Sequence, residues 1–462
     1  MTISAVEDPH QQGGAAGPAA AVQDEVYVAR QPLLDREGML CGFELKVRSP
    51  AVPDPDPANF TDSENDVAAL AQAVKDAQAA RVQVAKRVIQ AAAHPDAGSA
   101  LAGHMAYVDA SREMLFDETL RRLPPSRFML ELPPDLVADD MLVSRVIALH
   151  GKRYRFVLDD VTQPDDTFAK LLPYADAVKI DFGNTQPAWV PKLAKVLKAA
   201  GDSLIAKGLD TPGAFQTAFD LGFDRFQGYF FARPQAQGMR RAGAPRHALL
   251  NLLQLLASDP TVAQLEAELK LNPVLVMHLM RLANSSGLGL GHKVTSLREA
   301  INATGTNRIA RWTQLLLYAD GRKVSLEDDP LLQLAATRAR FMELAIERLP
   351  EAGRDEADAA FLTGVFSFVD AVFGEPLDST LDMLMLSRPI RAAILRREGA
   401  LGALLSAIDA LEHGAWSDLD AASTQLAPLT PGDVASLALV AAAWAGVADS
   451  SAEAAGLERI ED

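Results

Sequence analysis

The chain has 462 residues, of which 49% are hydrophobic and 23% charged, which fits a globular protein of about two or three domains. Its 61 acidic and 44 basic residues give a net charge of −17, so nucleic acids and anionic membrane surfaces are not expected as partners. Cys41 is the single cysteine, and no apolar run reaches about 18 residues, so we expect a protein of the reducing cytoplasm without a membrane span.

The N-terminal part begins with a segment that lacks any regular hydrophobic pattern. Residues 1–24 are rich in Ala, Gly and Gln and lack the basic and apolar regions of a signal peptide, so we expect a disordered tail. Two strand-like runs follow, Val26–Leu34 and Met39–Val47, and the polar residues between them predict a hairpin. A long helix is expected over Glu64–Ala93.

Short strands and helices then alternate as far as residue 234. Six further strand-like runs are separated by helical stretches, and this spacing predicts parallel βαβ units. Together with the hairpin they make eight strands, so we expect a TIM-like (β/α)8 barrel over residues 25–234 whose first strand runs antiparallel to its neighbour. The six runs are Met105–Val108, Phe128–Leu132, Arg155–Leu158, Ala177–Ile180, Leu204–Ala206 and Phe226–Gln227.

The second half of the chain is helical by its hydrophobic periodicity. Residues 235–245, which contain Pro, Gly and paired Arg, indicate a linker. From residue 246 to residue 447 strand signals nearly vanish and Pro and Asn mark helix starts, so we expect an all-helical domain. Residues 448–462 are expected to form a C-terminal tail.

Acidic and basic residues recur at or near the ends of the predicted barrel strands. Barrel enzymes collect their ligands and catalytic groups at the carboxyl ends of their strands, and carboxylate oxygens suit magnesium or manganese. An alternative for Asp159 and Asp160 is that they cap the following helix. The charged residues of this set are Glu44, Asp109, Glu131, Asp159, Asp160, Lys179 and Lys207.

Three segments of the first half resemble the EAL domain, the domain of cyclic-di-GMP phosphodiesterases. Glu44–Arg48 is similar to the Glu-x-Leu-x-Arg signature that opens this domain, with Lys46 at the place of the signature Leu. The opening Tyr27–Asp35 and the closing Gln227–Pro234 are also close to that family.

The helical half resembles the HDOD domain. Leu271–Leu275 and Arg281–Ser285 match one conserved segment of that family, and Ser296–Ile301 matches another. No adjacent His-Asp pair occurs in this half, so the resemblance implies a domain that lacks the metal-binding pair of the HD hydrolases. Together the two resemblances describe an EAL–HDOD bacterial signalling protein, in which the second domain contacts signalling proteins.

The resemblance to active EAL enzymes implies two divalent metals and a metal-activated water that cleaves one phosphodiester of cyclic-di-GMP. Asp109 stands where the family has Asn, and its oxygen still suits a metal. By resemblance the first metal would be held by Glu44, Asp109, Glu131 and Asp159 and the second by Asp160, Lys179 would orient the water, and Arg48 and Gln227 would contact the nucleotide and the site.

Three departures indicate a degenerate site. Lys207 replaces the glutamate that would hold the second metal, and we expect it to pair with Asp160. The loop at Val161–Pro164 lacks both glycines of the family pattern, and Pro134 replaces the second glutamate of a Glu-x-x-Glu segment. We therefore expect the first metal site to be retained and the second to be lost, with Lys179 vestigial and with either no cofactor or one magnesium or manganese ion.

These observations favour a catalytically inactive signalling protein that acts through protein contacts of its helical domain. Two alternatives stay open, an active or weakly active cyclic-di-GMP phosphodiesterase and a sensor that binds cyclic-di-GMP without cleaving it. A homodimer is also left open.

Overall fold

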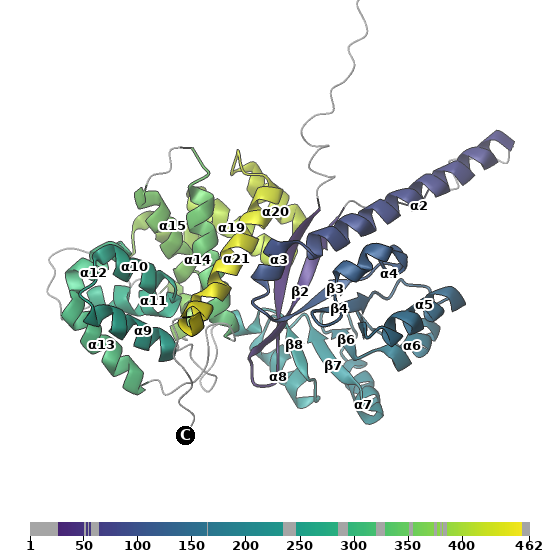
Figure 1. The fold of residues 1–462 in the computed structure, drawn as a ribbon, viewed down its shortest axis with the longest axis horizontal. Helices are drawn as coiled ribbons and strands as arrows, with labels where there is room; N and C mark the ends of the chain where they lie inside the picture. Colours follow the sequence, from purple (N-terminus) through teal and green to yellow (C-terminus); the bar gives the residue numbers. More distant parts are fainter. Residues whose placement is uncertain are drawn as a thin grey trace, which may run out of the picture.

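The computed structural model describes residues 26–49, 52–53, 55–56, 64–163, 165–233, 246–284, 294–319, 329–350, 354–373, 377–378, 381 and 386–454. The expected tail at 1–24 and the expected linker at 235–245 lie outside the described residues. Figure 1 shows a barrel on one side of the molecule and a helical domain on the other.

Eight strands form one closed barrel in sequence order, which confirms the predicted architecture. β1 pairs antiparallel with both of its neighbours, and the strands from β2 to β8 run parallel. The strands are β1 (Tyr27–Leu34), β2 (Leu40–Arg48), β3 (Met105–Asp109), β4 (Phe128–Leu132), β5 (Arg155–Leu158), β6 (Ala177–Asp181), β7 (Ser203–Lys207) and β8 (Arg225–Gln227).

The hairpin between β1 and β2 explains why the barrel begins with an antiparallel strand. The carboxylate of Asp35 accepts hydrogen bonds from the backbone N–H groups of Glu37 and Met39, at 3.0 and 2.8 Å. Gly38 has φ +77°, a left-handed conformation that side chains disfavour. These residues reverse the chain over a few positions, so the second strand returns beside the first.

Helices cover the outside of the barrel, and α2 extends well beyond it as a projecting rod (Figure 1). Short 3₁₀ turns lie at Glu118–Arg122, Leu172–Tyr174 and Phe230–Ala232. The barrel helices are α2 (Glu64–Ala92), α3 (Pro95–Ala100), α4 (Arg112–Phe116), α5 (Asp140–Gly151), α6 (Asp166–Leu171), α7 (Val190–Ala200) and α8 (Pro212–Asp220).

The barrel interior is divided into an apolar part and a charged part. Side chains from six of the strands, among them Leu33, Tyr107, Val157 and Ile205, form a buried apolar cluster. Residues at the same face but nearer the carboxyl ends of the strands are charged. Glu44 begins this charged part, at the position of β2 that pairs with Tyr107 in the next strand. Side chains alternate along a strand, so residues two positions apart share a face.

The second domain is entirely helical in its described residues. α14, α19 and α21 pack against strand β1 or against helices of the barrel side, and α21 also packs on α3. The helices are α9 (Arg246–Ala257), α10 (Val262–Lys270), α11 (Pro273–Ala283), α12 (Leu297–Thr304), α13 (Thr306–Ala319), α14 (Pro330–Ile346), α15 (Arg354–Phe366), α16 (Val369–Phe373), α18 (Arg388–Arg396), α19 (Gly399–His413), α20 (Trp416–Thr424) and α21 (Pro431–Ala454). α21 continues past residue 447, where the sequence suggested the end of the domain.

Candidate functional site

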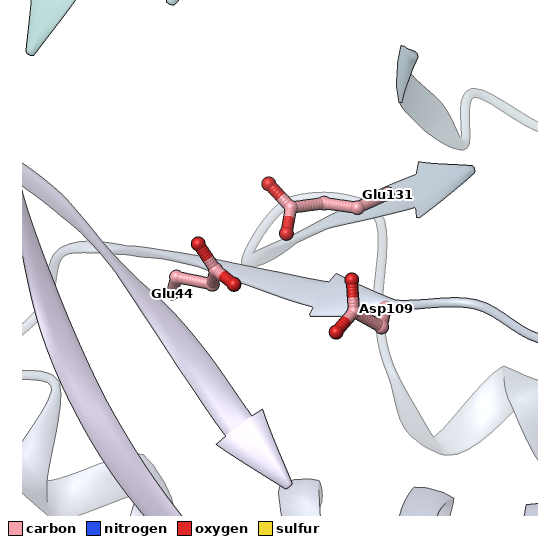
Figure 2. A group of neighbouring side chains, drawn as sticks. All are labelled: Glu44, Asp109 and Glu131. Carbon is pink, nitrogen blue, oxygen red and sulfur yellow. The ribbon is translucent and has the colours of Figure 1, made fainter. Parts of the chain in front are cut away.

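Three carboxylates from neighbouring strands converge at the carboxyl end of the barrel (Figure 2). Glu44 of β2, Asp109 of β3 and Glu131 of β4 each offer an oxygen, and these oxygens lie within 4.8 Å of one another. Glu44 and Glu131 are fully buried, whereas Asp109 stands at the exposed end of its strand. Of the four residues expected to hold the first metal, the structure brings these three together.

Lys179 lies fully buried among these acids. Its ammonium is 2.9 Å from Glu44, forms a closer ion pair with Glu131 and is 3.9 Å from Asp159. Burial alone would lower the pKa of Lys179, but the negative charges of Glu131 and Glu44 outweigh it and hold the pKa well above its usual value. Lys179 therefore carries a permanent positive charge in the centre of the charged part of the barrel.

Lys46 is a second cation in the cluster, and our sequence reasoning assigned it no role. Its ammonium forms an ion pair with the other carboxylate oxygen of Glu44. Glu44, Lys46 and Arg48 are spaced by two in β2, so they share one face of the strand. The spacing by two and the lysine at a position where the family has Leu are the sequence signals that could have predicted the role of Lys46.

The two buried glutamates respond in opposite ways to these lysines. Burial alone would raise the pKa of Glu44, but Lys179 and Lys46 together hold it well below its usual range. Burial and the charge on Glu44 raise the pKa of Glu131 well above its usual range. Of the two buried glutamates, Glu44 is therefore the stronger acid and Glu131 the weaker one.

Lys207 is the residue that the sequence predicts to replace a ligand of the second metal. Its ammonium lies 2.7 Å from Asp160 and 3.5 Å from Asp159, which is the pairing expected from the sequence. These acids raise the pKa of Lys207 in spite of its burial, so the charge is retained. Asp160 has a left-handed backbone with φ +48°, which few side chains adopt.

The loop that follows Asp160 is built differently from a glycine-rich loop. Val161 is buried in the hydrophobic core, and its N–H donates to the carbonyl oxygen of Lys179 at 3.1 Å. A cavity of about 240 Å³ opens here, lined by Pro134, Asp159, Asp160 and Thr162 among others. Space for a ligand group therefore remains beside Asp159 and Asp160.

The donor sets of the two expected metal sites fit a metal to different degrees. Glu44, Asp109 and Glu131 supply the hard oxygen ligands that magnesium or manganese prefers. However, both oxygens of Glu44 already contact lysine ammonium groups. At the second site, Asp159 and Asp160 are compensated by Lys207, and a positively charged side chain among the ligands does not fit a divalent cation.

The two residues expected to contact a nucleotide lie in different surroundings. Gln227 is fully buried, donates to Glu44 and donates to Gln31 at 2.7 Å. Arg48 stands at the end of β2, where its guanidinium binds both oxygens of Asp420, a residue of helix α20 in the second domain. The nucleotide contacts of these residues remain predictions.

Two family models match consecutive parts of the chain. Residues 59–234 match the model of the EAL domain, and residues 245–366 match the model of the HDOD domain. The two matches identify an EAL domain followed by an HDOD domain, in the order that the sequence motifs indicate.

Two relatives match over most of their length. The protein YuxH of Bacillus subtilis is 24% identical over 407 residues, which cover 87% of this chain and 94% of the relative. The cyclic di-GMP phosphodiesterase CdgJ of Vibrio cholerae is 24% identical over 401 residues, which cover 85% and 86%. The matched region therefore spans most of this chain and most of each relative.

Solved structures match less than half of the chain. The phosphodiesterase PaMucR in complex with c-di-GMP is 17% identical, covers 46% of this chain and 92% of its own, and has a TM-score of 0.33. BlrP1 of Klebsiella pneumoniae with calcium and cyclic-di-GMP is 18% identical, covers 46% and 57%, and has a TM-score of 0.33.

In the described part of the chain, every helix is too short or too polar to cross a membrane.

Proposed function

We propose that this protein takes part in cyclic-di-GMP signalling and that its EAL domain does not hydrolyse the nucleotide. In this proposal the barrel serves as a cytoplasmic signalling module, and the HDOD domain transmits its state through contacts with other signalling proteins. Support comes from the domain pair and from the likeness to a named cyclic di-GMP phosphodiesterase. Homodimer formation stays a prediction.

The observation that carries the proposal is the set of lysines bonded to the candidate ligands. Two lysines that stand where the resemblance implies other residues contact these ligands: Lys46 contacts Glu44, and Lys207 contacts Asp159 and Asp160. At about 4 Å and an effective dielectric constant of about 20, a lysine and a dication repel by about 8 kcal/mol before either moves. A carboxylate at the same distance would attract the dication by a similar amount, so a lysine in its place removes that attraction and adds the repulsion. We therefore expect that two metals are not held as two-metal hydrolysis requires.

The test is hydrolysis of cyclic-di-GMP by the purified full-length protein with Mg²⁺ or Mn²⁺, followed by chromatography of the products. We expect no turnover in the wild type, because the second metal is not held. Turnover that disappears in Glu44→Ala would overturn the proposal and establish the phosphodiesterase alternative.

Metal binding provides a second measurement that does not depend on turnover. Calorimetric titration with Mn²⁺ should show tighter binding to the double variant Lys46→Leu/Lys207→Glu than to the wild type, because two competing cations are removed. The double variant Lys192→Leu/Lys195→Glu, at exposed positions of α7, changes the net charge by the same amount outside the site and should leave Mn²⁺ binding as in the wild type. Equal Mn²⁺ binding in all three proteins would contradict the role given to the lysines.

Binding of cyclic-di-GMP without cleavage is the second candidate function. It is favoured by the cavity of about 240 Å³ beside Asp159 and Asp160. It is also favoured by Arg48, a cationic side chain at the end of β2 in a protein whose net charge is −17. A guanidinium binds phosphate in the same two-pronged manner as it binds carboxylate.

A further inference from the structure

The corner between helices α19 and α20 of the HDOD domain lies directly on the end of strand β2. A β-carbon at Gly414 would lie 3.9 Å from Cγ of Lys46. The ring of Trp416 packs edge-to-face on Tyr27 with centroids 5.7 Å apart. The second domain therefore contacts the same strand that supplies Glu44 to the acidic cluster.

The strongest contact of this corner is the ion pair between Arg48 and Asp420. The two terminal nitrogens of Arg48 each lie 2.6 Å from one oxygen of Asp420. Arg48 also donates to the hydroxyl of Tyr27. A carboxylate bound by both prongs of a guanidinium occupies the positions that two phosphate oxygens would take.

This ion pair is placed where it can open. The side chains of Arg48 and Asp420 are 21% and 38% exposed, so water and solutes reach them. Other contacts between the domains lie deeper: Arg30 donates to Thr337 at 2.8 Å, and Tyr229 donates to the carbonyl oxygen of Glu412 at 2.8 Å. Asp420 stands at the middle of α20, so loss of the Arg48–Asp420 pair would release this helix from the end of β2 while the domains stay joined.

We propose that Asp420 competes with an anionic ligand for Arg48. A phosphodiester group of cyclic-di-GMP at the end of β2 and the docked helix α20 then exclude each other. Nucleotide binding releases α20 and exposes the surface that the corner between α19 and α20 covered. This coupling transmits nucleotide binding from the barrel to the HDOD domain. The inference rests on the second candidate function in one respect, that the barrel binds this nucleotide.

The test compares the affinity of full-length proteins for cyclic-di-GMP by calorimetry in EDTA, so that binding is measured without hydrolysis. Asp420→Asn should bind about fivefold tighter than the wild type or better, since it removes the competing charge. Asp418→Asn changes the same charge at an exposed position of the same helix and should bind as the wild type does. Arg48→Gln should bind more weakly than either.

Hydrogen exchange of the wild type is the second measurement, and it needs no substitution. Saturating cyclic-di-GMP should speed amide exchange in residues 416–424, because α20 is released. Equal affinities of the wild type and Asp420→Asn, exchange of α20 that the nucleotide leaves unchanged, or no binding to any variant would each overturn the competition. Hydrolysis by the wild type with added metal would overturn the proposed function instead, and it leaves these two readouts as they are.

Discussion

At the scale of single residues, the charged part of the barrel shows that the same residue type can behave differently within one cluster. Ion pairs with lysine hold Glu44 and Glu131, and no such ion pair holds Asp109 among the described residues. Although Asp109 has an exposed edge, protein atoms crowd its carboxyl group. This desolvation, with the charge of Glu44 added, raises the pKa of Asp109 to about 6.

The raised pKa predicts a pH-dependent stability. An unfolded aspartate titrates near about 3.9, so between about pH 4 and pH 6 the folded protein binds a proton that the unfolded chain has released. Folding is then favoured at low pH, and the contribution of Asp109 to stability falls as the pH rises through its folded pKa. Asp109→Asn should therefore gain stability relative to the wild type from pH 4 to pH 7, as measured by urea unfolding. A difference between the two proteins that stays constant over this range would contradict the shifted pKa.

At the scale of elements, close helix packing holds the HDOD domain together. Gly364 in α15 lies so close to α14 that a β-carbon there would be 2.5 Å from Cα of Ala339 and 2.7 Å from the carbonyl carbon of Arg338. Both neighbours are backbone atoms of a buried helix, so they cannot rotate away. α14 is buried along nearly its whole length, and it contacts both α19 and α21.

Gly364→Ala should destabilise the protein by about 1–3 kcal/mol, because the added methyl group forces the two helices apart. The measurement is the free energy of unfolding in urea. Gly213→Ala is the matched control: Gly213 lies at an exposed position in the first turn of α8, and a β-carbon there meets nothing within 4 Å. The control should be neutral or stabilising by up to about 1 kcal/mol. Equal effects of the two substitutions would show that the helix crossing is not tight.

At the scale of the whole molecule, a buried ion network of the HDOD domain lies where that domain meets the barrel. Arg338 of α14 is 2% exposed and binds Asp409 at 2.6 Å and Glu412 of α19 at 2.9 Å. The backbone carbonyl of Glu412 accepts the hydroxyl of Tyr229, which belongs to the barrel. The cavity left between β1 and these helices is only about 30 Å³, so the interface is closely packed.

Arg338→Met should cost about 3–5 kcal/mol, because it leaves Glu412 buried without its partner. Urea unfolding followed by tryptophan fluorescence and circular dichroism should show one transition in the wild type and a lower midpoint in the variant. Adding Glu412→Gln should restore part of the loss. Arg348→Met, at an exposed position, should keep the midpoint of the wild type, and an unchanged midpoint in Arg338→Met itself would show that the network does not stabilise the fold.

The sequence determined the closed barrel, its antiparallel start and the helical second domain. Local patterns of hydrophobic residues specify strands and helices, and a hairpin turn such as Asp35–Gly38 reverses the chain within a few residues. The sequence also placed Glu44, Asp109 and Glu131 at strand ends. The carboxyl ends of parallel strands meet at one edge, so those residues could be expected to converge.

The tertiary structure alone decided which charges pair. Local spacing could bring Lys46 to the face of Glu44, but only the closed barrel shows that Lys46 and Lys179 hold the two oxygens of one carboxylate. The partner of Arg48 is 372 residues away in the chain, and no local pattern specifies such a contact. Ion pairs between distant residues depend on how whole domains dock, which is why the link between the barrel and the HDOD domain appears only in the folded molecule.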